Sequence, residues 1–360
     1  MDPSMIQLNR NFTRMKIATR FVGILLLLVA LFSCKKNGTV STVPPSTPVA
    51  DTPIVKGADI SWLTQMESSG IKFYNAAGTA MDGMQLLQSL GINAIRLRVW
   101  VNPAGGWNNN ADVVAKAVRA KKLGLRIMLD FHYSDTWADP GHQTKPAAWA
   151  AYDFTTLRDT LYSYTVSVLD TLKANGVVPS WVQVGNETSD GMLWPDGRAS
   201  TNMANFATLI STGYRAVKSI NDSIKVIVHI ANGYDNSLFR WIFDGLKAGG
   251  AQWDIIGMSL YPTAANWQSY NDSCLANMKD MIARYNKQVM ICEVGMPADE
   301  ASTCQAFLTD LISKTRSVTG GNALGVFYWE PEAYNNWQGY GLGAFDNTGK
   351  PTVAMNAFIH

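Results

Sequence analysis

The sequence predicts a single α/β domain over residues 54–360, folded as a (β/α)8 TIM barrel. Eight short apolar runs alternate with longer amphipathic stretches, the pattern of successive βα units with a parallel sheet. All eight runs fit within roughly 300 residues, which is the size of one such barrel. No G-x-G-x-x-G or P-loop pattern follows the first run, so the main support for an open nucleotide-binding sheet is missing.

Each expected strand is a short stretch rich in apolar residues. Between the strands, apolar residues recur at three- and four-residue spacing, which indicates helices. Two of these segments end at Gly124 and Gly176, where glycine suits a left-handed C-cap. The expected strands are, in order, GADISWL (57–63), AIRLRVWV (94–101), RIMLDFHY (126–133), WVQVGNE (181–187), KVIVHIANG (225–233), IIGMSLYP (255–262), QVMICEVGM (288–296) and GVFYWEPE (325–332).

Nearly every expected strand begins apolar and ends in a reactive or hydrogen-bonding side chain. The carboxyl ends of the strands in a (β/α)8 barrel open onto one face, where active sites of this fold lie. The start of a loop would by itself favour Gly, Asp, Asn and Ser, so this composition indicates a functional site. The side chains concerned are Asp59, Arg96, Arg98, His132, Asn186, Glu187, His229, Tyr261, Glu293, Trp329 and Glu330.

Tryptophan placement indicates what that face binds. Of the twelve tryptophans, all but Trp181, Trp241 and Trp253 fall at strand ends or in the loops that follow. Flat aromatic faces beside polar groups suit stacking on sugar rings, so we predict a carbohydrate cleft. Any single tryptophan could instead support a loop. The nine are Trp62, Trp100, Trp107, Trp137, Trp149, Trp194, Trp267, Trp329 and Trp337.

Glu187 and Glu293 end the fourth and seventh expected strands. A carboxylate after an apolar run is costly unless it has partners or a chemical role. Cleavage of a glycosidic bond needs one carboxyl group that donates a proton and one that stays ionised. The pair therefore predicts a glycosidase, although a salt-bridged glutamate at a strand end remains the alternative for each.

The longer motifs resemble glycoside hydrolase family 53, the arabinogalactan endo-β-1,4-galactanases. An Asn-Glu pair ending strand four and a Glu ending strand seven are similar to clan A retaining glycosidases. The resemblance covers residues 57 to 332. It is carried by GADISWL, INAIRLRVWVNP, LDFHYSDTWADPGHQ, WVQVGNETSDGMLWP, VIVHIANG, ICEVG and FYWEPE.

The resemblance implies a role for each matching residue. Glu187 would be the general acid/base and Glu293 the nucleophile of a retaining double displacement. Asn186 would bind the 2-hydroxyl of the sugar in subsite −1, and Tyr261 would orient the nucleophile. Arg96 matches the strand-two arginine of the clan, and a cation near Glu293 would favour its ionised form.

Further substrate contacts follow from the same resemblance. His132 matches the strand-three histidine, and Trp329 matches the tryptophan that floors subsite −1. Asp135 and Trp137, in the loop after strand three, are expected to contact substrate as well. Arg98, two residues after the strand-two arginine, shares its face of the strand.

The N-terminal segment indicates export and lipid anchoring. Residues 1–33 read as a signal peptide whose translation start could be Met15, and the sequence before Cys34 resembles a bacterial lipobox. A plain signal peptide or a membrane anchor is the alternative. Residues 34–53 would be the lipidated cysteine and a Ser/Thr/Pro-rich tether. We therefore expect a lipoprotein of the cell envelope, held at the outer membrane or cell surface.

Charge and cysteine content limit the partners further. Without residues 1–33 the chain has 26 basic and 27 acidic residues, so nothing indicates a nucleic-acid surface. We expect a monomer acting on a neutral polysaccharide, with no cofactor. The histidines lack metal-ligand spacing, and the segment after Glu293 lacks the Asp-x-Asp pattern of a calcium loop. A Cys274–Cys304 disulfide is one option, with Cys292 left free.

Two other functions remain open from the sequence. A β-mannanase or β-glucanase of clan A would share the same glutamates. A surface glycan-binding lipoprotein without catalysis would keep the barrel, but the intact Asn186, Glu187 and Glu293 disfavour that alternative.

Overall fold

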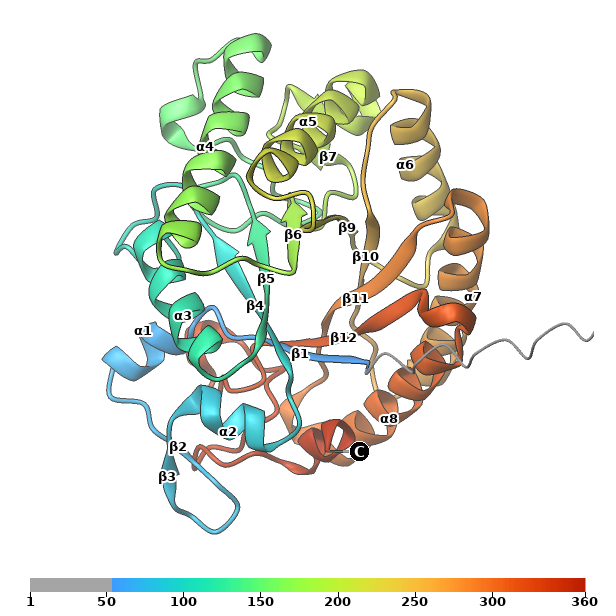
Figure 1. Ribbon diagram of the computed structural model, residues 1–360. Helices are drawn as coiled ribbons and strands as arrows, with labels where there is room; N and C mark the ends of the chain where they lie inside the picture. Colours follow the sequence, from blue (N-terminus) through green and yellow to red (C-terminus); the bar gives the residue numbers. More distant parts are fainter. Residues whose placement is uncertain (1–53, 360) are drawn as a thin grey trace, which may run out of the picture. The chain divides into compact units, whose positions relative to one another are not determined.

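The computed structural model describes residues 54–359, and the expected signal peptide, Cys34 and tether lie outside that range. Eight parallel strands close into a barrel, with the last strand paired to the first (Figure 1). The barrel strands are β1 (Val55–Asp59), β4 (Ala94–Val99), β5 (Arg126–Phe131), β6 (Trp181–Val184), β9 (Lys225–Ile230), β10 (Ile255–Leu260), β11 (Gln288–Val294) and β12 (Ala323–Trp329). Two small antiparallel pairs are β2 (Phe73–Tyr74) with β3 (Ala80–Met81), and β7 (Gly191–Met192) with β8 (Gly197–Arg198).

Helices surround the barrel, as expected of a (β/α)8 fold. Gly124 and Gly176 follow the ends of α3 (Asn110–Lys122) and α4 (Phe154–Ala174) with φ of 72° and 73°, which confirms the predicted left-handed caps. No helix within residues 54–359 is both long and apolar enough to cross a membrane. The helices are α1 (Leu63–Ser68), α2 (Gly83–Ser89), α3 (Asn110–Lys122), α4 (Phe154–Ala174), α5 (Ala199–Ile220), α6 (Asn236–Ala248), α7 (Trp267–Tyr285) and α8 (Ala301–Ser317).

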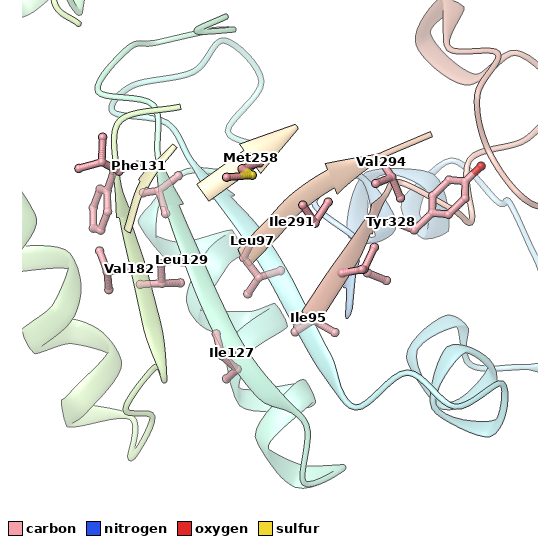
Figure 2. Packing of buried hydrophobic residues seen from close by; sticks show 14 of the residues in the cluster. Ile95, Leu97, Ile127, Leu129, Phe131, Val182, Met258, Ile291, Val294 and Tyr328 are labelled. Atoms are coloured by element: carbon pink, nitrogen blue, oxygen red, sulfur yellow. The ribbon is translucent and has the colours of Figure 1, made fainter. Parts of the chain in front are cut away.

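Alternation along the strands divides the core in two. One set of side chains packs in the main buried cluster with residues of the surrounding helices, as Leu97, Leu129 and Ile291 do in Figure 2. The other set fills the lower part of the barrel interior. That second cluster consists of Val55, Ala94, Met128, Trp181, Ile227, Ile255, Met290, Cys292 and Phe327.

Gly57 on β1 shows how tightly the interior is filled. A Cβ at this position would lie 2.1 Å from the ring of Phe327 on the neighbouring β12. Only glycine leaves room for that ring, so this part of the interior has no space for another methyl group.

A polar layer lies above the apolar interior layer. Residues two positions apart on a strand share a face, so Arg96 follows Ala94 and Asp130 follows Met128 on the inner side. Gln183 and His229 follow Trp181 and Ile227 in the same way. The strands thus place apolar side chains at the bottom of the barrel and hydrogen-bonding side chains near its carboxyl ends.

A β-bulge in β11 decides where Glu293 points. Met258 of β10 pairs with Ile291, whereas the next residue, Ser259, pairs with Glu293, so Cys292 is an extra residue. Cys292 belongs to the interior cluster, and Glu293 also faces inward because it contacts Arg96. Strict alternation would have turned Glu293 toward the helices. Bulges next to active sites commonly re-aim a side chain in this way.

All eight predicted strands are confirmed, but several end earlier than predicted. β1 ends at Asp59 and β6 ends at Val184, whereas the sequence predicted that these strands would continue to residues 63 and 187. After β6, Gly185 and Glu187 have φ of 87° and 43°, which extended backbone does not allow.

The suggested Cys274–Cys304 disulfide does not form. Cys274, Cys292 and Cys304 are all buried free thiols. Burial raises the pKa of Cys274 to about 12 and that of Cys304 to about 11, which keeps both protonated.

Candidate active site

A pocket of about 330 Å³ lies at the carboxyl ends of the barrel strands. It contains both of the predicted carboxylates, Glu187 just after β6 and Glu293 near the end of β11. The pocket is lined by His132, Trp137, Ala138, Asp139, Asn186, Glu187, Tyr261, Glu293, Trp329, Tyr340 and Leu342.

Glu293 is held by two donors, one on each carboxylate oxygen. Its Oε1 lies 2.7 Å from Nη2 of Arg96, and its Oε2 accepts a 2.9 Å hydrogen bond from the Tyr261 hydroxyl. Burial and the nearby Glu293 charge raise the pKa of Tyr261 well above its usual value, so the hydroxyl keeps the proton that it donates. Both contacts stabilise an ionised Glu293.

Glu187 has a different environment. The positive φ after Gly185 turns its side chain into the pocket, and its backbone N–H lies 3.4 Å from Nδ1 of His229. Among residues 54–359 no Lys or Arg forms an ion pair with Glu187 at 4.0 Å or less. Its carboxyl therefore lacks the direct cation that Glu293 has.

The two carboxyl groups titrate as a pair. Burial raises the pKa of Glu187 to about 7 and that of Glu293 to about 8, and the charge of Glu187 contributes to the rise at Glu293. These values alone would leave the shared proton on Glu293. The direct contacts favour the reverse, because Arg96 and Tyr261 both hold Glu293, whereas the Ser259 hydroxyl and the more distant Arg96 charge lower the pKa of Glu187 without offsetting its burial. The direct contacts thus distinguish the two carboxyl groups.

Arg96 connects the polar layer to the site. Its guanidinium also donates to Asp59 at 2.7 Å and to Gln183 at 2.6 Å, and it lies 2.9 Å from Asp130. Burial alone would lower the pKa of Arg96, but the charges of Asp130, Glu293 and Asp59 outweigh it and hold the pKa well above its usual value. A permanent buried cation is thus fixed beside Glu293.

Asn186 is oriented between Arg96 and the loop after β5. Its Oδ1 accepts from Nη2 of Arg96 at 2.8 Å, and its Nδ2 donates to the carbonyl of Ala138 at 2.7 Å. An amide nitrogen carries two N–H donors. The second N–H of Asn186 is left for a group that enters the pocket.

Both ring nitrogens of His132 form hydrogen bonds within the protein. Nδ1 accepts from Trp100 Nε1 at 3.2 Å and from the Ala138 N–H at 3.0 Å, while Nε2 lies 3.0 Å from Asp130. Burial lowers the pKa of His132, so the ring is neutral with its proton on Nε2, facing Asp130. His132 lines the pocket while bracing Trp100 and the loop.

A second pocket of about 380 Å³ adjoins the first and shares Trp137, Trp329 and Tyr340 with it. The rings of Trp62, Trp137, Trp329 and Tyr340 make edge-to-face contacts with centroids 4.6 to 5.8 Å apart. The second pocket is lined by Trp62, Gln65, Trp100, Ala104, Trp107, Trp137, Trp329, Gln338, Gly339 and Tyr340.

Comparison with known proteins agrees with this geometry. The family described as Glycosyl hydrolase family 53 matches residues 55–358. The chain belongs to glycosyl hydrolase family 53. An uncharacterized protein of Niallia circulans is 36% identical over 330 residues, covering 83% of this chain and 89% of the relative. A probable arabinogalactan endo-β-1,4-galactanase A of Neosartorya fischeri is 35% identical over 303 residues, covering 78% and 85%.

Solved structures show the same barrel. A structure from a study of two fungal β-1,4-galactanases superposes with a TM-score of 0.79 and 31% identity, covering 85% of this chain and 99% of that one. Family membership therefore makes the chain a glycosidase with a (β/α)8 fold, as the sequence predicted.

Most of the residues that the family resemblance suggested meet in one place. Eight of them line the first pocket or contact its carboxylates, and the Tyr261–Glu293 and Arg96–Glu293 contacts have the expected partners. The eight are Arg96, His132, Trp137, Asn186, Glu187, Tyr261, Glu293 and Trp329.

Asp135 and Arg98 lie elsewhere. Asp135 is absent from both linings, and its two oxygens accept the backbone N–H groups of Asn102 and Ala147, so it braces loops in this family 53 structure. Arg98 does share the inner face with Arg96, but it pairs with Glu330 rather than with Glu293.

Sequence reasoning missed two residues that line the first pocket, and it named a third, His229, without its contacts. Asp139 and Tyr340 line the first pocket but come from loops, where no strand pattern pointed to them. His229 contacts Asn186 at 3.1 Å and Ser259 at 2.8 Å. Its position at the end of a strand was noted, yet nothing in the sequence indicated which side chains it would meet.

Proposed function

We propose that this chain is an endo-acting, retaining glycosidase that cleaves β-1,4-galactosidic bonds in galactan or arabinogalactan. One observation supports the mechanism above all others. Two carboxyl groups share a pocket, and Arg96 and Tyr261 make direct contacts with Glu293 but not with Glu187. This asymmetry suits Glu293 as the ionised nucleophile and Glu187 as the proton donor.

In the first step, a Glu293 carboxylate oxygen attacks the anomeric carbon as the bond to the leaving oxygen breaks. Glu187 transfers its proton to that oxygen, and the shortened chain departs with a free hydroxyl. A covalent glycosyl ester at Glu293 remains. The free N–H of Asn186 would bind the 2-hydroxyl, a contact that strengthens as positive charge develops on the ring.

In the second step, the ionised Glu187 removes a proton from water while the water oxygen attacks the anomeric carbon. The ester bond breaks, Glu293 returns to its carboxylate form, and Glu187 is protonated again. Two inversions give overall retention. This mechanism predicts carboxyl groups roughly 5 to 5.5 Å apart.

Endo action and galactose specificity rest on different support. The adjoining aromatic pocket offers space for further sugar units beyond the one at the carboxylates, which suits binding within a long chain. The preference for galactan is supported by relatives named as arabinogalactan endo-β-1,4-galactanases, such as the enzyme of Thermothelomyces thermophilus. A β-mannanase or β-glucanase is the alternative that the site chemistry alone would allow.

The direct test is digestion of β-1,4-galactan, mannan and barley glucan in parallel. We expect oligosaccharides of mixed length from galactan early in the reaction, and NMR should show that they are released as β-anomers. Release of oligosaccharides from mannan or glucan but not from galactan would contradict the proposed preference for galactan. Release of single sugars from the outset would contradict endo action.

Catalytic roles need matched variants. Glu187→Gln and Glu293→Gln should each reduce galactan hydrolysis by at least about a thousandfold, the usual loss for a removed catalytic group. Glu300→Gln makes the same substitution at a half-buried glutamate beyond β11 and should keep full activity. Full activity of either the Glu187 or the Glu293 variant would contradict the catalytic role proposed for that residue.

We further propose that the enzyme is a monomer held by a lipid at the cell envelope. Support comes from the sequence alone, from the signal-like residues 1–33 and the tether that follows Cys34. An enzyme tethered on the outer membrane would meet polysaccharide that is too large to enter the cell.

A further inference from the structure

Arg98 on β4 lies among the indole rings that line the second pocket. Its guanidinium carbon is 4.2 Å from the ring centre of Trp137, 4.8 Å from Trp100 and 5.6 Å from Trp62. The side chain is 1% exposed, and its Nε and Nη2 atoms have no hydrogen-bond partner among residues 54–359. The tryptophan faces are therefore the main neighbours of this buried cation.

Glu330, directly after β12, is the carboxyl group that contacts Arg98, and burial together with the charge of Asp59 raises its pKa to about 8 against the opposing charge of Arg98. Its Oε1 lies 3.3 Å from Nη1 of Arg98, and its two oxygens are 3.2 and 3.1 Å from the backbone N–H of Trp62. Glu330 has a φ of 49°, so the chain turns sharply at the point where Trp329 enters the pocket. One buried carboxyl group thus contacts both the cation and the backbone of an aromatic lining residue.

We propose that Glu330 and Arg98 are positioning residues that set the geometry of the second pocket for a β-1,4-linked sugar chain. Neither side chain lines either pocket, so both act through Trp62, Trp100 and Trp137. The inference deepens the proposed function and rests on it. It assigns the aromatic pocket to substrate binding and leaves bond cleavage to the first pocket.

Removal of the Glu330 carboxyl group should disturb the tryptophans specifically. A buried cation whose partner is lost either moves toward water or draws water inward. The indole rings pack directly on Arg98, so they would shift with it. The contacts of Glu293 with Arg96 and Tyr261 involve neither Glu330 nor Arg98.

Glu332 provides a matched control two residues along the same segment. It is 0% exposed, as Glu330 is, but neither of its carboxyl oxygens has a hydrogen-bond partner among the described residues. Burial and the neighbouring Glu330 raise its pKa well above the usual range, and within residues 54–359 Arg98 forms its ion pair with Glu330 rather than with Glu332. Glu332→Gln therefore makes the same substitution in the same region without removing an ion pair.

The experiment compares Glu330→Gln, Glu332→Gln and the unsubstituted enzyme on a long galactan. For Glu330→Gln we expect KM to rise about tenfold, the effect of one poorly placed aromatic contact, with kcat within about twofold. Its pH profile should match that of the unsubstituted enzyme. Glu332→Gln should leave KM unchanged, and Glu330→Asp, which keeps a carboxyl group at this position, should recover part of the loss.

Several results would overturn the inference. They are an unchanged KM in Glu330→Gln, an equal rise in Glu332→Gln, or a fall in kcat alone that follows the folded fraction measured by circular dichroism. If Glu330→Gln does not fold, Arg98→Lys tests the same point, because it keeps the charge but loses the planar group. Unchanged KM in Arg98→Lys would contradict the proposal.

The proposed substrate and this inference can be contradicted independently. An unsubstituted enzyme that degrades mannan or glucan but not galactan would contradict the substrate. The KM comparison would then be made on the glycan that is degraded, and the same rise in Glu330→Gln would still be expected.

Discussion

At the scale of single residues, the two glutamates differ only through partners that are distant in sequence. Both follow apolar runs, and their local sequences give no reason to ionise one before the other. Arg96 from β4 and Tyr261 after β10 make the difference, because both reach Glu293. Family resemblance supplied these roles, whereas strand pattern alone predicted only that the side chains would share a face.

The pH dependence of catalysis follows from this asymmetry. In the proposed mechanism Glu187 must be protonated to act as the acid, and burial raises its pKa to about 7. We therefore expect kcat/KM for galactan to fall as pH rises through about 7. Loss of the negative charge on Glu293 defines the acidic limb of the profile.

The acidic and alkaline limbs of the pH profile can be separated with an activated substrate. An aryl β-galactobioside with a good leaving group needs no proton donor in its first step. With that substrate we expect Glu187→Gln to retain a measurable glycosylation step whose rate lacks the alkaline limb. An alkaline limb that persists in this variant would assign the upper pKa to another group.

At the scale of elements, the predicted strands were right in number, order and type, because eight apolar runs between glycine-capped helices leave few alternatives. Their ends were wrong where backbone geometry changes, as at Gly185 and Glu187. The bulge at Cys292 could not be predicted either. The sequence there reads as a uniform strand, and the extra residue is visible only against the register of β10.

The close contact between β1 and β12 gives a stability prediction at this scale. Gly57→Ala should lower the free energy of unfolding by about 1–3 kcal/mol, because the added Cβ overlaps the Phe327 ring. Denaturant unfolding would measure the change. Gly341→Ala is the control, since a Cβ there meets nothing within 4 Å.

A compensating change tests the stated cause. Phe327→Leu in the Gly57→Ala background should recover part of the lost stability, because the smaller side chain makes room. If the double variant is destabilised by the sum of the two single effects, overlap with that ring is not the reason.

At the scale of the whole molecule, stability and chemistry occupy different layers of the barrel. The lower interior is apolar, and the polar network around Arg96 lies between it and the pocket. Composition and periodicity predicted this division, since each strand changes character along its length. Loop residues such as Asp139 and Tyr340 were missed because loops have no periodicity to place them.

Lipid attachment at Cys34, which lies outside residues 54–359, can be tested with the full chain. When it is produced in a bacterium that processes lipoproteins, we expect the chain to incorporate labelled palmitate and to sediment with membranes. Cys34→Ser should abolish both, because the thiol is the acceptor. Cys304→Ser removes a buried thiol of the barrel and should leave the label in place. Label retained by Cys34→Ser would contradict lipidation at this residue.

The bulge in β11 also bears on how such a barrel tolerates insertions and deletions. Loss of one residue from a barrel strand normally exchanges its inner and outer faces. Loss of Cys292 would instead restore regular pairing while Glu293 stays inside, because Ile291 and Val294 already face the helices. The carboxyl would then stand lower by up to about one residue rise, roughly 3.3 Å. Evolution could thus adjust the depth of the Glu293 carboxyl group in this fold by changing the length of one strand.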